Sequence, residues 1–163
     1  MNRRAFLTLL ASLPATLPLA GCGFQLRGRD AIAYRSLYID APETSQAARQ
    51  LADALRNRGI VVVETAQTAD ATVKLAQERE NRTVLALSGG GRVREYRLNY
   101  TLSYSLTGKD GQEIFPLSEI LQSRDFTYDD NQYLAKTAEE NFLYRDLRED
   151  AVRQIVRRLS KNK

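Results

Sequence analysis

Residues 96–107 alternate strictly between apolar and polar side chains, and this pattern constrains the fold more than any other part of the sequence. Arg, Asn, Thr or Ser separates each apolar residue from the next, and the apolar set is Tyr96, Leu98, Tyr100, Leu102, Tyr104 and Leu106. A period of two places the two sets on opposite faces of a β-strand. The pattern therefore predicts a long strand with one face in a core and one polar face, which is either solvated or lines a partner.

Glycine-rich turns flank this strand and predict two hairpins. Gly89–Gly91 precedes it, and Gly108–Gly111 follows it. Such turns reverse the chain between antiparallel strands. We therefore expect strands over 71–88 and 112–128 on either side, with Pro116 indicating an edge position or a bulge.

A compact strand, helix and strand are expected before the hairpins. Residues 36–40 and 60–64 have strand composition, and the second is rich in β-branched residues. Between them, Thr44 or Ser45 can cap a helix that Gly59 would end. Strands joined in this way run parallel if they share a sheet.

The last element is predicted to be a long amphipathic helix that begins around Asp129–Asn131. Apolar residues recur every four positions at Leu143, Leu147, Ala151, Ile155 and Leu159. The fold class that follows is α+β, with one twisted, mostly antiparallel, mixed β-sheet and two helices packed on one face.

The first 22 residues have the features of a secreted lipoprotein. Arg3 and Arg4 precede an apolar stretch that contains two prolines and ends in Leu-Ala-Gly-Cys22, a sequence that resembles a lipobox. We expect residues 1–21 to be a removable signal peptide and Cys22 to carry an N-acyl group and an S-diacylglycerol. The alternative is an uncleaved anchor with an incidental cysteine. Residues 22–33 would then be the acylated tether and residues 34–163 a single domain.

Details of the same segment bear on sorting and export. Gly rather than Asp at position 23 favours the outer membrane, by resemblance to the sorting rule for Gram-negative lipoproteins. The paired arginines fit both a general secretion signal and a twin-arginine signal, so both export routes stay open.

The composition argues against several functional classes. Lys and Arg number 24 and Asp and Glu 20, and removal of the signal peptide leaves a net charge of +2, so we expect no nucleic-acid partner. There is one cysteine and no histidine, which excludes an internal disulfide and argues against a metal site. No nucleophile with a base is visible, and adjacent carboxylates such as Glu139 and Glu140 point apart on a helix. We therefore expect neither an enzyme nor a cofactor beyond the lipid on Cys22.

Arg92 and Arg94 follow the glycine turn and are candidates for anion contact. The turn lacks the Gly-Lys-Ser/Thr ending of a phosphate loop and opens no helix. The other interpretation is that both arginines are simply solvated at a hairpin tip.

Several stretches together resemble the LptE family of lipopolysaccharide-assembly lipoproteins. They are Cys22–Gly28 after the lipobox, Arg94–Leu98 at the start of the alternating strand, Leu134–Lys136 in the last helix and Arg157–Leu159 near its end. The resemblance implies a periplasm-facing outer-membrane lipoprotein that sits as a plug in the LptD β-barrel. It would assist assembly of that barrel and delivery of lipopolysaccharide to the outer leaflet. The competing interpretation is an adaptor lipoprotein of another envelope or barrel-assembly complex.

The resemblance also implies basic residues that bind lipopolysaccharide. Lys136 lines up with a family lysine at the start of the last helix. The second family position, an arginine, falls in the glycine turn here, so Arg92 is the nearest candidate and Arg94 lies beside it. Charge-assisted hydrogen bonds to lipid A phosphates would be the physical basis. The alternative for Lys136 is an exposed helix lysine paired with Glu140 at i+4.

Overall fold

A computed structural model describes residues 32–161 of the chain. The predicted signal peptide, Cys22 and the tether up to residue 31 lie outside the described residues. The described part contains five strands and two α-helices. Their bounds are β1 Ser36–Asp40, α1 Gln46–Arg56, β2 Val61–Val63, β3 Ala71–Leu87, β4 Val93–Gly108, β5 Glu113–Thr127 and α2 Tyr133–Lys161.

All five strands form one mixed sheet in the order β2-β1-β3-β4-β5. β1 pairs in parallel with β2 and with β3, whereas β3, β4 and β5 form an antiparallel meander. The predicted α+β class is therefore confirmed, including the parallel arrangement around α1. Pro116 lies on the edge strand β5, where the pairing with β4 also shifts register between Phe115 and Ser118. Both interpretations of this proline thus apply.

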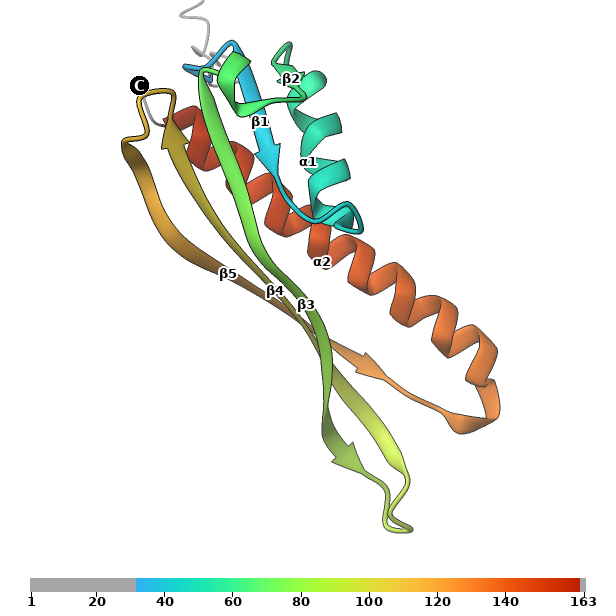
Figure 1. Ribbon diagram of the computed structural model, residues 1–163. Helices are drawn as coiled ribbons and strands as arrows, with labels where there is room; N and C mark the ends of the chain where they lie inside the picture. The colour runs from blue at the N-terminus through green and yellow to red at the C-terminus, as the bar shows by residue number, and fades with distance from the viewer. Residues whose placement is uncertain (1–31, 162–163) are drawn as a thin grey trace, which may run out of the picture.

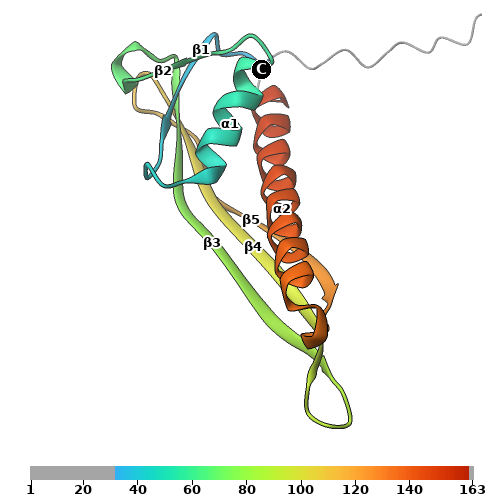
Figure 2. The same ribbon diagram turned by 90° about the vertical axis from the view of Figure 1, so that its right-hand side faces the viewer.

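Both helices cover the same side of the sheet (Figure 2). The alternating strand β4 buries its apolar face against them, and Leu98, Tyr100, Leu102 and Leu106 are completely inaccessible. Leu147, Ala151, Ile155 and Leu159 of α2 are buried opposite, as the four-residue spacing predicts. Burial of this apolar area, at about 25 cal/mol per Å², is the main contribution to stability.

Local capping sets the ends of the helices. Ser45 caps α1 and its hydroxyl accepts a hydrogen bond from the Ala48 N–H at 3.1 Å. After the helix, Gly59 takes a φ of +81°, and the Ile60 N–H donates to the Leu55 carbonyl at 3.1 Å. At the start of the last element, a 3-10 turn over Asp130–Gln132 precedes α2, so the α-helix itself begins later than the acidic residues suggest.

The molecule is elongated, and its two ends differ (Figures 1 and 2). The β3–β4 hairpin projects beyond the helices at one end. At the other end lie the start of the described chain, the end of α2 and the turn of the β4–β5 hairpin. β3 contains an irregularity at Ala76, between Leu75 and Gln77, that resets which of its residues face the helices.

Candidate functional site

The uncovered face of β3, β4 and β5 is polar and nearly neutral. Asn99, Thr101 and Ser103 lie along its centre, and their partners on β3 are Asn81, Arg79 and Gln77. The Asn99 amide nitrogen lies 3.4 Å from the Thr83 hydroxyl. Neither α1 nor α2, the two α-helices of residues 32–161, covers this side of the three strands (Figures 1 and 2). It therefore presents donors and acceptors over a broad area, as the alternating pattern predicts.

An ion pair and two leucines mark the β5 side of this open face. Arg97 donates from Nε and Nη2 to the two carboxylate oxygens of Asp125, at 2.7 and 3.0 Å. These hydrogen bonds hold the pKa of Asp125 below its ordinary value. Leu117 and Leu121 are 65% and 64% exposed on the edge strand. An exposed apolar pair beside a polar sheet is typical of a contact surface.

The β3–β4 hairpin tip carries the two candidate arginines. Gly91 adopts a φ of +76°, which favours glycine, and its N–H donates to the Ser88 carbonyl at 2.9 Å. Arg92 and Arg94 are exposed, and within residues 32–161 their side chains have neither a hydrogen bond nor an ion pair. Val84, Leu85 and Leu87 of the same hairpin are also exposed. The tip thus combines free cations with apolar side chains.

The hairpin lies next to the segment that leads into α2. Arg92 and Arg94 line a small hollow of about 50 Å³ together with residues 128–131. That segment contributes Asp129 and Asp130, so carboxylates and guanidinium groups line the same hollow at this end of the molecule. The predicted arginines and the start of the last helix are therefore brought to the same end.

Lys136 is held in place by protein contacts. Its ammonium group lies 3.0 Å from the Glu139 carboxylate and 5.3 Å from the centre of the Phe126 ring. Its side chain is 17% exposed. Glu140 instead pairs with Arg82 of β3 at 2.8 Å. The alternative interpretation, an exposed lysine paired with Glu140, is therefore wrong, because Glu140 pairs with Arg82 and Lys136 lies against Glu139 and Phe126.

A buried ionic cluster joins four elements and was not predicted from the sequence. The Arg148 side chain of α2 is 7% exposed, and it donates to Glu78 at 3.2 Å and to Glu80. Glu78 also accepts hydrogen bonds from the Ser45 hydroxyl at 2.7 Å and the Tyr100 hydroxyl at 3.0 Å. Burial, followed by the Glu78 charge, raises the pKa of Tyr100, which keeps it a neutral donor. The cluster therefore fixes α1, α2, β3 and β4 relative to one another.

One signal in the sequence could have revealed this cluster. Arg148 stands four residues after Tyr144 and four before Val152, so it lies on the buried face of the helix. A buried arginine requires carboxylate partners. The identity of those partners depends on the Ala76 irregularity, which turns Glu78 and Glu80 toward the helices.

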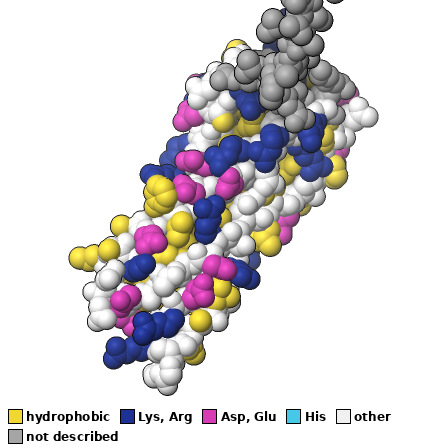
Figure 3. Space-filling model, turned by 180° about the vertical axis from the view of Figure 1, so that it is seen from behind, with side chains coloured by type: hydrophobic (Ala, Val, Ile, Leu, Met, Phe, Trp, Pro, Cys, Tyr) yellow, Lys and Arg dark blue, Asp and Glu magenta, His cyan; other side chains and the backbone are white. Residues whose placement is uncertain are grey.

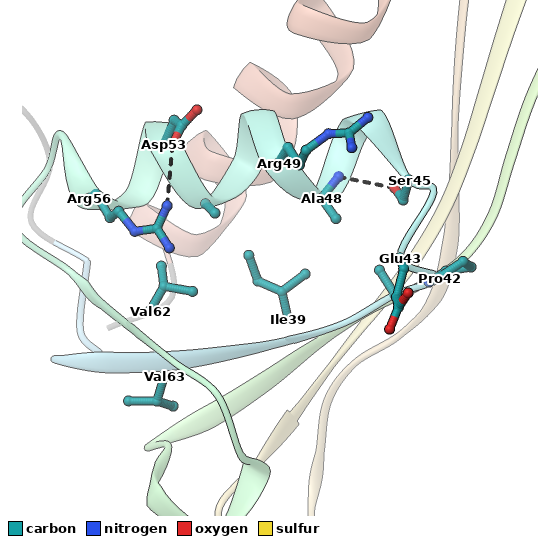
Figure 4. Close-up of a pocket in the computed structure, with 12 residues that line it drawn as sticks. Ile39, Pro42, Glu43, Ser45, Ala48, Arg49, Asp53, Arg56, Val62 and Val63 are labelled. Atoms are coloured by element: carbon teal, nitrogen blue, oxygen red, sulfur yellow. Dashed lines mark hydrogen bonds and ion pairs between the residues drawn. The ribbon is translucent and has the colours of Figure 1, made fainter.

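A hollow with a volume of about 450 Å³ lies between α1 and the β1–β2 edge (Figure 4). Ile39 and Val62 point from the strands toward the helix. Glu43 and Arg49 point in different directions at the rim, and Arg56 pairs with Asp53 at 3.3 Å. The charged groups do not converge on one point, so we assign this groove no ligand.

Two further properties concern residues 32–161. This part of the chain contains no group of three or more metal-ligating side chains of the His, Cys, Asp or Glu type. None of its helices is long and apolar enough to cross a membrane.

Comparison with known proteins identifies the family. Residues 34–159 match the family model described as LptE, Lipopolysaccharide-assembly. The LPS-assembly lipoprotein LptE of Photorhabdus laumondii is 30% identical over 96% of this chain and 86% of the relative. The protein of the same name from Pectobacterium atrosepticum is 31% identical over 98% of this chain and 86% of the relative.

Solved structures show the same fold. An uncharacterized lipoprotein B from Nitrosomonas europaea has a TM-score of 0.74 and 34% identity, covering 85% of this chain and 90% of that protein. Rare lipoprotein B from Shewanella oneidensis has a TM-score of 0.68 and 23% identity over 77% and 94% of the two chains, and it supports the fold alone. The fold and these similarities define an α+β bacterial lipoprotein. The chain belongs to the LptE family and is a lipoprotein involved in lipopolysaccharide assembly.

Proposed function

We propose that this protein partners and plugs the LptD β-barrel in the outer membrane, assists its assembly and supports delivery of lipopolysaccharide to the outer leaflet. The observation that carries the proposal is the polar open face of β3, β4 and β5. A barrel lumen is lined by polar side chains and water. A plug surface needs hydrogen-bonding groups in place of an apolar patch, and the half-buried Asn99 and Thr101 supply them.

The elongated shape suggests how the protein is oriented. The described chain begins at Ile32, at the end opposite the hairpin tip (Figure 1). An acylated Cys22 would be separated from Ile32 by ten residue steps, which span at most about 35 Å. The anchored end would therefore stay near the periplasmic surface of the outer membrane while the hairpin tip enters the lumen. More than one acyl chain on Cys22 would make this anchoring stable.

The free arginines of the tip are the proposed contacts for lipid A phosphates. Arg92 and Arg94 are exposed, and a guanidinium group binds phosphate with two parallel hydrogen bonds. Lys136 is proposed as a further contact that must first leave Glu139. The proposed role is binding and structural, without catalysis.

The test is recovery of the barrel with a tagged protein. A C-terminally tagged chain would be expressed in its native host, the outer membrane solubilised gently, and copurifying proteins identified and quantified. We expect a large β-barrel in stoichiometric amount. Recovery of the lipoprotein alone, or with an unrelated assembly complex, would favour an adaptor role and contradict the plug.

A matched pair of variants shows whether the open face makes the contact. Thr101→Arg places an unpaired charge in the centre of that face, and Gln67→Arg makes a similar change on an exposed residue at the anchored end. Unpaired charge in a packed interface is costly, so we expect severalfold less barrel with Thr101→Arg and an unchanged yield with Gln67→Arg. Thermal unfolding of both variants checks that the fold is intact.

A further inference from the structure

The anchored end of the molecule carries cations that no carboxylate neutralises. Arg58 follows α1, and Arg157, Arg158 and Lys161 lie in the last turns of α2. We call these four residues the anchor-end basic patch. Within residues 32–161, none of them forms an ion pair with a carboxylate. Arg153, one turn earlier, is neutralised by Glu149 and Asp150.

Contacts between the helix ends hold the patch together. Arg58 donates to the Ser160 hydroxyl at 3.2 Å, which joins the end of α1 to the end of α2. Arg158 donates to the Tyr104 hydroxyl at 2.9 Å and lies over the Phe115 ring at 4.7 Å. Arg157 and Lys161 are exposed and have no hydrogen-bond partner in the described part of the chain. Two members are thus positioned by neutral groups, and two are free.

The cations gather where the described chain begins. Viewed from behind, dark blue side chains cluster toward the upper end of the molecule (Figure 3). No Asp or Glu occurs after Asp150 in the sequence. The helix dipole favours cations at a helix C-terminus. Arg58 lies at the C-terminal end of α1 and is favoured by the dipole of that helix in the same way, but the dipole does not account for Arg157 and Lys161 at i and i+4, a spacing at which like charges repel.

We propose that the anchor-end basic patch lies on the anionic phospholipid headgroups of the leaflet that holds the acylated Cys22. The assignment rests on the anchoring part of the proposed function. Ten residue steps join Cys22 to Ile32, so the lipid surface is within about 35 Å of the patch end of the domain. Basic residues next to a lipid anchor are attracted to anionic headgroups. In the lipoprotein that has not yet met its barrel, the patch would orient the domain with the hairpin tip away from the membrane surface, and entry of the tip into the lumen would require the domain to leave this position.

The experiment measures the orientation of the full mature lipoprotein in vesicles. Cys22 is the sole cysteine of the sequence, so an introduced cysteine gives a unique labelling site once Cys22 is acylated. Asn57→Cys places a fluorophore beside the patch, and Gly90→Cys places one at the hairpin tip, where there is open space for a side chain. Quenching by nitroxide-headgroup lipids is compared between vesicles with phosphatidylglycerol and vesicles of phosphatidylcholine alone.

We expect phosphatidylglycerol to increase quenching at position 57 and to leave position 90 unchanged. Arg157→Gln with Lys161→Gln should lower the equilibrium constant for docking of the domain on the lipid surface by about fivefold per removed cation, and quenching at position 57 should fall accordingly. The matched control, Arg79→Gln with Arg145→Gln, removes two exposed cations outside the patch and should keep the quenching. Added salt should weaken the quenching at position 57, because salt screens the attraction between the cations and the headgroups.

Three results would overturn the assignment. The first is equal quenching at position 57 with and without phosphatidylglycerol. The second is quenching that appears only when lipopolysaccharide is added, which would assign the patch to that lipid. The third is a mature chain whose mass shows no acyl groups, which would remove the anchor itself. The vesicles contain no barrel, so failure here is distinguishable from failure of the proposed LptD partnership.

Discussion

At the residue scale, loss of the Arg148 side chain should lower the free energy of unfolding more than loss of an exposed arginine on the same helix. Arg148 is 7% exposed and satisfies Glu78 and Glu80 together. Arg148→Ala removes the cation that pairs with Glu78 and Glu80 and leaves Glu78 only its hydrogen bonds from neutral groups. Because both carboxylates are partly exposed, we expect a cost of about 2 kcal/mol. Urea unfolding followed by circular dichroism measures the change.

Arg145→Ala is the matched control for that measurement. Arg145 is exposed on the same helix and its contact is with the Phe142 ring, so we expect a change within about 0.5 kcal/mol. Equal losses for the two variants would contradict the structural role of the buried cluster. A variant that also removes the Glu78 charge, Glu78→Gln with Arg148→Met, should recover part of the lost stability.

Asp70 should make the free energy of unfolding depend on pH in the acidic range. Its carboxylate accepts hydrogen bonds from the N–H groups of Ser36 and Arg35, at 2.9 and 3.0 Å, which lower its pKa below the ordinary 3.8. A group with a lowered pKa in the folded state contributes stability above its unfolded pKa, and that contribution is lost as the pH falls through the folded pKa.

The corresponding measurement compares urea midpoints of the wild type and Asp70→Asn at pH 7 and at successive values below the ordinary pKa of 3.8. We expect the wild type to lose its advantage over the variant as the pH falls through this acid range. A constant difference between the two proteins would show that the Asp70 carboxylate does not contribute in this way.

Residue-scale features were predictable where they follow a local pattern. The inward positions of Tyr100 and Tyr104 follow from period two alone. The partners of Arg148 were not predictable, because the Ala76 irregularity changes the face of every following residue in β3. The contacts of Lys136 also depend on tertiary structure, since Phe126 is on another element.

At the element scale, the β3–β4 hairpin is expected to be the main site of anion contact. Arg92→Gln with Arg94→Gln removes two free guanidinium groups from its tip. A hydrogen bond to a charged group contributes about 1.5 kcal/mol or more, so we expect roughly a tenfold loss of lipopolysaccharide affinity per arginine. Binding of purified lipopolysaccharide to the tagged protein measures this, and Arg79→Gln with Arg145→Gln, which removes two exposed cations away from the tip, is the charge-matched control.

In the same assay, Lys136→Gln distinguishes the contribution of α2 to lipopolysaccharide affinity from that of the hairpin. Lys136 already has Glu139 and Phe126 as neighbours, so its loss should weaken binding less than the loss of both arginines. A larger effect for Lys136→Gln in a protein with unchanged unfolding would contradict the leading role of the arginines and assign it to the lysine.

Strands and helices were predictable as elements because each contains a local signal. The glycine turns and the alternation define β4, and Ser45 and Gly59 flank α1. The predicted start of α2 was less accurate, because Asp129 caps a 3-10 turn before the α-helix begins at Tyr133. Acidic residues indicate a helix start without distinguishing the two kinds of helix.

At the scale of the whole molecule, the two ends and the open face have separate proposed roles. The anchored end would meet the membrane surface, the hairpin tip would meet lipid A, and the polar face would meet the barrel. The antiparallel meander of β3, β4 and β5 and the burial of one face were implied by sequence patterns, whereas the place of β1 between β2 and β3 was not. The elongated shape was not, because it depends on how far the hairpin extends past the helices (Figure 2).

The most direct test of the plug is site-specific photo-crosslinking in intact cells of the native host. A photoreactive residue at Thr101 would lie on the open face, and one at Gln67 would lie at the anchored end. The account predicts that Thr101 crosslinks to LptD in high yield and that Gln67 does not. Absence of a barrel crosslink at Thr101, in cells where the lipoprotein is acylated and folded, would contradict the claim that this face fills the LptD lumen.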